Sequence, residues 1–261
     1  MPSPNGVMRE IQQEFTRVQK VTDQRVIGYL KQSMEEINRV LANSPSEYET
    51  WHLEKVKKEL KQLLKEASNQ AAMATGSQLK DAYELGGQLV DQPLIATGAM
   101  AKGVMPVLNV RQLEKMSAFT TGKIKDIATE LLPRMNTELS FVMTGVKNPF
   151  EAAQAIDKIA NIGMNRALVI TRTETGRAFS AATQTRLEDA SELIPDMQKK
   201  WKGSGKAMPR ATHAAADGQI VGVNESFSIG GIPMRFPKDP LAPIGEVVNC
   251  GCTVLPHHPS W

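Results

Sequence analysis

The only two cysteines in this 261-residue sequence, Cys250 and Cys252, lie one residue apart near the end of the chain. Thiolates and imidazoles are ligands that zinc prefers, so the pair could form a metal site with His213 or with the adjacent His257 and His258. Structural zinc sites use Cys-x2–4-Cys turns, however, and cysteine is among the most often buried residue types. Two buried thiols on a packed strand are therefore the favoured interpretation. No cofactor is expected, and zinc bound by Cys250, Cys252 and His213 is the alternative.

Cysteine catalysis and a disulfide are both less favoured. A nucleophilic thiolate needs a base within reach, and two of the three nearby histidines lie in the C-terminal tail. No motif in the sequence identifies an oxyanion hole. A disulfide between Cys250 and Cys252 would close a strained ring.

The stretch TRTETGRA at 171–178 places Arg172, Glu174 and Arg177 on an expected helix. One interpretation is a solvated helix face on which Glu174 and Arg177 pair three residues apart. The other is a fixed arginine–glutamate network that docks the helix onto the C-terminal part of the chain, or a substrate site. Both interpretations remain open from the sequence.

Five basic residues gather around Trp201 and a flexible Gly-Ser-Gly, without an acidic residue between them. Such a cluster can contact DNA phosphates in a salt-sensitive manner that is independent of base sequence, although most charge runs are only solvated. The net charge of +3 is too small to indicate nucleic-acid binding by itself. The candidate DNA contacts are Lys199, Lys200, Lys202, Lys206 and Arg210.

Long amphipathic helices are expected to hold these residues in place. Apolar residues recur at steps of three and four over 11–41 and again over 48–74, with Ser46 and Glu49 forming a capping box before the second helix. Frequent glycine and proline predict short helical pieces and loops over 75–110.

Helical periodicity returns over 110–145, where Gly122 and Pro133 are expected to interrupt it. Asn148 then caps a new helix, with proline in its first turn and glutamate at its third position. That helix is expected to end at 161–163, and another of about 30 residues follows.

Beyond Pro195 the helical period gives way to short strand candidates at 219–223, 226–229 and 232–236. Gly230-Gly231 is a two-residue hairpin signal between the last two. The predicted fold class is α+β: the N-terminal two-thirds are mostly α-helical, and a small C-terminal α+β module of short antiparallel strands follows a boundary near 145–150.

The order of these residues resembles the phage Mu F-like minor head protein family, also called head morphogenesis proteins. An Arg-Thr-Glu helix, a tryptophan, an Arg-x-x-His, an Asp-Gly and an Asn-Cys-x-Cys follow one another over roughly 150–256, and this ordered set is more specific than any single motif. The matching positions are Arg172, Thr173, Glu174, Trp201, Arg210, His213, Asp217, Gly218, Phe227, Pro237, Asp239, Pro240, Glu246, Asn249, Cys250 and Cys252.

The resemblance implies a low-copy minor head protein of a tailed bacteriophage, which supports head assembly and genome packaging, retention or delivery. Residues 1–147 would be a helical region that associates with the portal or capsid, and 148–261 the Mu F-like module. The expected partners are the portal protein, the capsid interior and packaged DNA, with copies that self-associate or differ in conformation. The expected location is inside the capsid of the virion at the portal vertex, after assembly in the host cytoplasm.

The resemblance also implies a polar cluster that joins the long helix to the strands, and its expected members are Arg172, Glu174, Arg210, His213, Asp217 and Glu246. A non-enzymatic role is expected. The alternative is an ADP-ribosyltransferase- or nuclease-like enzyme with a catalytic set of Arg172, Glu174, His213 and Glu246. Two departures from the family pattern argue against an intact catalytic centre: Gly251 replaces a common arginine, and Lys206-Ala207 stands where an acidic residue is usual.

Composition adds broad limits. Apolar residues make up 41% and charged residues 23% of the sequence, which is typical of a globular protein and excludes wholesale disorder. No stretch approaches the length of a membrane span and no signal-peptide segment is recognised at the N-terminus, so no membrane partner is expected.

Overall fold

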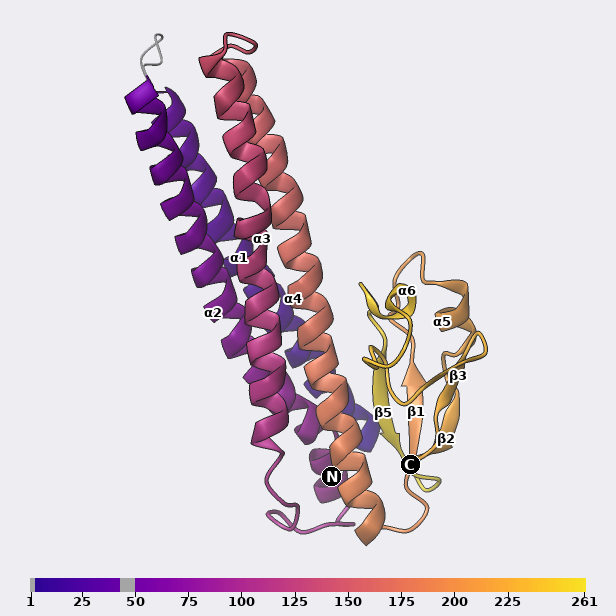
Figure 1. The fold of residues 1–261 in the computed structure, drawn as a ribbon. Coiled ribbons are helices and arrows are strands. Elements are labelled where there is room, and N and C mark those ends of the chain that lie inside the picture. The colour runs from indigo at the N-terminus through magenta and orange to yellow at the C-terminus, as the bar shows by residue number, and fades with distance from the viewer. Residues whose placement is uncertain (1–2, 43–49) are drawn as a thin grey trace. The chain divides into compact units, whose positions relative to one another are not determined.

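The computed structural model describes residues 3–42 and 50–261 (Figure 1). Its internal contacts divide the chain into two compact units, and each unit draws on several segments because the long helices contribute to both. Unit 1 consists of Met1–Lys20, Ser77–Ser117 and Arg172–Trp261, and unit 2 of Val21–Gly76 and Ala118–Thr171. These units do not follow the predicted boundary at 147/148, which stays a prediction about function. The predicted capping box of Ser46 and Glu49 lies outside the described residues.

The elements confirm the predicted α+β class, with helices dominating the N-terminal part and short antiparallel strands at the C-terminal end. The helices are α1 (Pro4–Ala42), α2 (Thr50–Ala96), α3 (Val110–Met143), α4 (Pro149–Leu193), α5 (Ala211–Ala215) and α6 (Ile244–Val247). The strands are β1 (Gln198–Lys202), β2 (Ile220–Gly222), β3 (Phe227–Ile229), β4 (Ile232–Met234) and β5 (Thr253–His257). Within the described residues, no helix combines the length and the apolar character that crossing a membrane requires.

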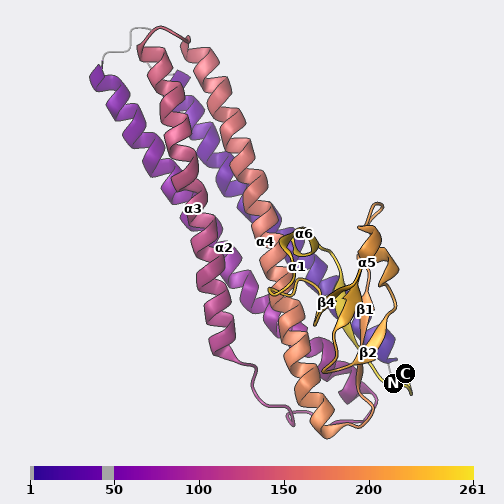
Figure 2. The same ribbon diagram turned by 45° about the vertical axis from the view of Figure 1, so that its right-hand side comes forward.

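Unit 2 is a bundle of four helix segments, which run side by side in Figures 1 and 2. Each segment contributes apolar side chains at helical spacing to one core, which includes Val26, Leu64, Ile127 and Ile156. Burial of such a stripe is the main stabilisation of a long helix, because helix propensity alone is weak.

The predicted breaks in α3 and α4 are wrong, since both helices are continuous. Pro133 lies inside α3 between the buried Leu131 and Met135, so packing of the bundle outweighs the hydrogen bond that proline cannot donate. Gly163 does not end a helix, because it lets α4 approach α3: a Cβ at this position would lie 2.3 Å from Cδ1 of Leu131.

The predicted short pieces over 75–110 are also largely wrong, because α2 continues to Ala96 and only the stretch from there to Val110 is irregular. Gly86 lies inside α2 against α4, where a Cβ would come within 2.3 Å of the carbonyl oxygen of Phe179. The hydroxyl of Thr183 donates a hydrogen bond to the carbonyl oxygen of Gly86 at 3.0 Å. Glycine therefore serves close helix packing here.

The predicted start of α4 is confirmed. The backbone N–H of Glu151 donates to Oδ1 of Asn148 at 2.9 Å, and the N–H of Asn148 donates to the Glu151 carboxylate at 3.1 Å. The two side chains satisfy amide groups that the first turn of a helix leaves without a partner, as a capping box does.

In unit 1, two small antiparallel sheets follow α4. The first has the order β2-β1-β5, with Lys200 opposite both Ile220 and Leu255. The second is the β3–β4 hairpin, whose turn at Gly230-Gly231 has two positive φ angles of 59° and 85°, as the predicted two-residue turn requires.

The core of unit 1 joins the sheets to the C-terminal half of α4, beside which both views draw the strands (Figures 1 and 2). Trp201 of β1 and Phe227 of β3 are fully buried in it, and their rings meet edge to face at 5.3 Å. Leu187 of α4 belongs to the same cluster. The segment 199–210, which holds the candidate DNA contacts, thus begins as the central strand of a sheet.

Candidate functional site

The two thiols and His213 converge in the interior of unit 1. Sγ of Cys250 lies 3.4 Å and Sγ of Cys252 3.5 Å from Nδ1 of His213. All three residues are buried, with exposed fractions of 7%, 2% and 2% in the order Cys250, Cys252, His213. Among the described residues these three form the one group of histidine, cysteine and acidic side chains that could hold a metal ion.

The cysteines lie in the segment between α6 and β5, so the expectation that both sit on a strand is wrong. Asn249, which precedes them, has a φ of 56°, in the left-handed region that asparagine tolerates better than most residues. Gly251 between them lies against Ser204, where a Cβ would come within 2.7 Å of the Ser204 Cβ. Burial of both thiols, as predicted, also keeps them from a substrate.

Glu246 orients the imidazole from the other side. Its Oε2 lies 2.8 Å from Nε2 of His213 and accepts a hydrogen bond from the Nε2–H group. The other ring nitrogen, Nδ1, is therefore the one that faces the sulfur atoms. Thr212, on α5 next to His213, donates to the same carboxylate oxygen at 3.3 Å. The hydrogen bond with Cys250 and the one with Glu246 raise the pKa of His213, against the effect of burial.

The backbone before the cysteines is held by side chains from two other parts of unit 1. Nη2 of Arg210 donates to the carbonyl oxygen of Val248 at 2.6 Å, and Nζ of Lys206 donates to that of Asn249 at 2.7 Å. The N–H of Asn249 donates to Oγ1 of Thr173 on α4 at 3.3 Å. Two residues predicted to contact DNA, Lys206 and Arg210, thus shape the cysteine segment.

Lys238 holds the segment from the opposite end. Its Nζ donates to the carbonyl oxygen of Cys252 at 3.0 Å, and burial lowers the pKa of this ammonium. Gly176 on α4 makes room for it, because a Cβ there would lie 2.5 Å from Cε of Lys238. Arg177 donates to the Lys238 carbonyl oxygen at 3.0 Å and pairs with Glu174 at 2.5 Å.

The electrostatics of the thiols follow from these contacts. The hydrogen bond from Cys252, together with those of His213 and the charge of Lys238, holds the pKa of Cys250 well below its ordinary value. The same hydrogen bond, together with burial, raises the pKa of Cys252, and the indole N–H of Trp201 opposes this by donating toward its sulfur. The site therefore favours one thiolate beside one thiol when only protons are bound.

The expected six-residue polar cluster is only partly assembled around His213. His213 and Glu246 are in direct contact, and Arg210 binds the carbonyl oxygen of Val248 in the segment 246–252. Glu174 forms its ion pair with Arg177, Arg172 is exposed, and Asp217 accepts a hydrogen bond from the backbone N–H of Gly203 at 2.8 Å. The other residues that hold this region together are Thr173, Gly176, Arg177, Thr212 and Lys238.

The prediction that Lys199 contacts DNA is wrong, because its side chain is fully buried. Its Nζ donates to Oε1 of Gln184 at 3.0 Å and to the carbonyl oxygen of Arg235 at 2.9 Å. Burial lowers the pKa of Lys199 to about 8. Alternation along a strand explains the difference from Lys200 and Lys202, which are half-buried and exposed.

A hollow of about 410 Å³ lies beside the cysteine segment, between α1 and the two loops that carry Ser204 and Gly251. Arg9 and Lys202 line it, and both are exposed. The remaining described residues that line it carry no carboxylate, so the hollow is positively charged. Gln12 of α1 closes one side by donating to Oγ1 of Thr253 at 3.0 Å.

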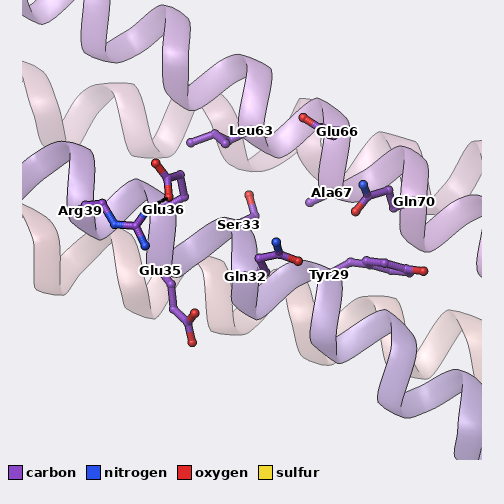
Figure 3. A pocket seen from close by; sticks show the side chains of 10 residues that line it. All are labelled: Tyr29, Gln32, Ser33, Glu35, Glu36, Arg39, Leu63, Glu66, Ala67 and Gln70. Atoms are coloured by element: carbon purple, nitrogen blue, oxygen red, sulfur yellow. Dashed lines mark hydrogen bonds and ion pairs between the residues drawn. The ribbon is translucent and has the colours of Figure 1, made fainter.

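A separate hollow of about 370 Å³ lies in unit 2 between α1 and α2 (Figure 3). Its lining is polar, with Gln32 and Glu35 on α1 and Glu66 and Gln70 on α2. None of the residues predicted to form a site lines it.

The sequence matches the family model described as "Phage Mu protein F like protein" over residues 122–255, more than half of the chain. The match begins within α3, further toward the N-terminus than the motif residues indicated. No solved structure matched the chain.

Three curated relatives cover parts of the chain. It is 36% identical to the NAD(+)–arginine ADP-ribosyltransferase EFV of Enterococcus faecalis over 44% of this chain and 24% of that protein. It is 32% identical to the uncharacterized protein YqbB of Bacillus subtilis over 54% of this chain and 49% of that protein. It is 28% identical to the minor head protein GP7 of Bacillus phage SPP1 over 40% of this chain and 34% of that protein. The chain thus spans from about a quarter to about a half of the length of these relatives.

Proposed function

Because the chain belongs to the family of phage Mu F-like proteins, we propose that it is a minor head protein of a tailed bacteriophage. It acts inside the capsid at the portal vertex in few copies, and it supports head assembly and genome packaging, retention or delivery. The observation that carries the proposal is the family match over residues 122–255, together with the relative that is named a minor head protein.

The architecture suits a structural role in the head. The buried site is built from side chains that hold backbone carbonyl groups in place, and its thiols are closed to substrate. Residues 1–147 are proposed to associate with the portal protein or the capsid interior, and copies are proposed to self-associate or to differ in conformation. Assembly would take place in the host cytoplasm, without a membrane.

Contact with packaged DNA is part of the proposal and is assigned to the positively charged hollow. Arg9 and Lys202 face it, and Lys200 lies on the same strand as Lys202. Cationic side chains without an acidic neighbour attract phosphate groups without regard to base sequence. Lys206 stays a candidate contact through the N–H groups of its ammonium that do not bind the Asn249 carbonyl, and Arg210 through the guanidinium nitrogens other than Nη2, which binds the Val248 carbonyl.

The test is the protein content of purified heads from a phage that encodes this chain. Quantitative mass spectrometry is expected to find the chain at a few copies per portal, and coexpression is expected to yield a complex with the portal protein. Heads that contain the portal protein but lack this chain would contradict the proposal.

Arginine ADP-ribosylation is the second candidate function, and the Enterococcus faecalis relative favours it. The match covers only 24% of that protein, so the shared stretch is proposed to be a non-catalytic module in both. Incubation with labelled NAD+ and an arginine-rich acceptor separates the two functions. Label transfer that Glu246→Gln abolishes without a change in melting temperature would establish the enzyme.

A further inference from the structure

We propose that His213, Cys250 and Cys252 bind one zinc ion, which clamps α5 to the segment that leads into β5. The inference does not depend on the function proposed above, because it rests on the geometry of these three side chains alone. In the sequence, the spacing of the two cysteines made zinc less favoured than two buried thiols. In the folded chain, the positions of the three side chains favour zinc.

The distances between the three ligand atoms fit a tetrahedral metal site. A zinc ion with Zn–S bonds of about 2.3 Å and a Zn–N bond of about 2.0 Å separates nitrogen from sulfur by roughly 3.5 Å. The two N···S distances from His213 are 3.4 and 3.5 Å. All three ligand atoms lie within 4.8 Å of one another, so one ion can reach them together.

Hydrogen bonding alone accounts for only one of the two sulfur contacts. The Nδ1 atom of a neutral imidazole has one lone pair, which accepts one S–H. Both Cys250 and Cys252 nevertheless lie at almost equal distances from that single atom of His213. A metal ion on the Nδ1 lone pair explains both contacts, with each sulfur bound as a thiolate.

The surroundings of the ligands are those of a metal site. Glu246 accepts the other ring proton of His213, and a carboxylate–histidine pair of this kind fixes the tautomer and strengthens a histidine ligand. Within the described residues, the buried indole N–H of Trp201 meets no oxygen or nitrogen acceptor, and it faces the sulfur of Cys252. Lys238 and Arg210 hold the backbone on either side of the two cysteines, so the ligands are positioned in advance.

Zinc is the ion that this donor set selects. Two thiolates and an imidazole suit a borderline-soft cation, and two thiolates balance its two positive charges. Three protein ligands leave the fourth tetrahedral position for a water molecule. The strands of this region have three to five residues, so an internal clamp adds stability that such short elements lack.

The test is the metal content of the full chain after purification without chelators. Elemental analysis is expected to find about one zinc per chain, and X-ray absorption is expected to find a mixed sulfur and nitrogen shell around it. Cys250→Ser and Cys252→Ser are expected to lose the ion, and His257→Ala, which changes a histidine outside the cluster, is expected to retain it. Glu246→Gln is expected to weaken zinc binding by about 10- to 100-fold, because it removes the charge that supports His213.

Cobalt substitution keeps the proposal testable if the cysteine variants fail to fold. The wild-type chain loaded with Co2+ is expected to show sulfur-to-cobalt charge-transfer absorption of a tetrahedral thiolate site. Wild-type protein that contains no zinc and takes up neither zinc nor cobalt when one equivalent is added would overturn the proposal. Zinc that a Cys250→Ser/Cys252→Ser double variant retains in full would overturn it as well.

Discussion

Nε2 of His213 and Oε2 of Glu246 lie 2.8 Å apart, although 33 residues separate the two in the chain. His213 lies on the short helix α5 and Glu246 on the short helix α6, so this contact joins two separate helices. The histidine side chain is 3% exposed and the glutamate 19%, so water screens the pair only weakly. The contact turns the other ring nitrogen toward the two cysteines.

Loss of this contact is expected to destabilise unit 1. Glu246→Ala should lower the free energy of unfolding by about 1.5–3 kcal/mol, the range for a hydrogen bond to a charged partner. Urea unfolding followed by Trp fluorescence measures the effect. Glu192→Ala is the control, because Glu192 is exposed at the end of α4 and its removal should change stability by less than about 0.5 kcal/mol. Equal effects of the two substitutions would contradict the role given to Glu246.

The free energy of unfolding is expected to fall in acid, because of Asp239. Burial opposes ionisation, but hydrogen bonds from Arg235 and from the backbone N–H of Leu241 hold the pKa of this carboxyl below its usual range. A lowered pKa contributes stability above the pKa of the unfolded chain, about 3.9, and the contribution is lost as pH falls below it. Asp239→Asn should therefore flatten the fall in urea midpoint between pH 5 and pH 3. An unchanged fall in the variant would show that Asp239 does not contribute.

Stability is also expected to rise with pH in alkali, because of Lys199. Burial lowers its pKa to about 8, below the value of about 10.4 in an unfolded chain. The unfolded state therefore binds more protons between these values, and stability rises with pH across that window, by on the order of 2 kcal/mol. Lys199→Met should abolish the rise in urea midpoint between pH 7 and pH 10, whereas Lys202→Met on the exposed end of the strand should retain it. A rise of the same size in Lys199→Met would assign it to another group.

Two helix glycines should respond in opposite directions to alanine. Gly86→Ala places a Cβ within 2.3 Å of the Phe179 carbonyl oxygen, so α2 and α4 must move apart, at a cost of about 1–3 kcal/mol. Gly28→Ala meets no atom within 4 Å and should stabilise α1 by about 0.5–1 kcal/mol through higher helix propensity. Thermal melting of the two variants distinguishes them. Stabilisation by Gly86→Ala would contradict the close packing of α2 on α4.

The positively charged hollow predicts salt-dependent DNA binding. Arg9→Glu and Lys202→Glu should each weaken binding to duplex DNA and lower the slope of log K against log salt by about 1. Fluorescence anisotropy with a duplex of arbitrary sequence measures both quantities. Lys102→Glu is the control, because Lys102 lies on an exposed turn and does not line this hollow. Equal losses from all three substitutions would indicate a general charge effect in place of a defined surface.

Local signals were the part of the fold that could be predicted from the sequence. The hairpin at Gly230-Gly231 and the capping box of Asn148 and Glu151 depend on residues within three positions of each other, and both are confirmed. Gly86 and Gly163 were misinterpreted as breaks, because a glycine that ends a helix and one that admits a neighbouring helix look alike in one sequence. Their meaning depends on Phe179 and Leu131, which are distant in the chain.

The site was predicted in its residue types but not in its contacts. The order of His213, Glu246 and the two cysteines indicated the family correctly. Lys199 and Lys238 were not recognised as buried, because lysine is almost never fully buried without partners and those partners come from distant segments. Lys238 in particular depends on Gly176, whose missing side chain leaves the space for it.

The position of the chain in an assembled phage head tests the central claim most directly. Cryo-electron microscopy of heads from the encoding phage, compared with heads from a strain in which this gene is deleted, should show difference density inside the capsid at the portal-bearing vertex. The account predicts density there for few copies of the chain. Difference density on the tail or on the outer capsid surface, or none in any part of the head, would contradict it.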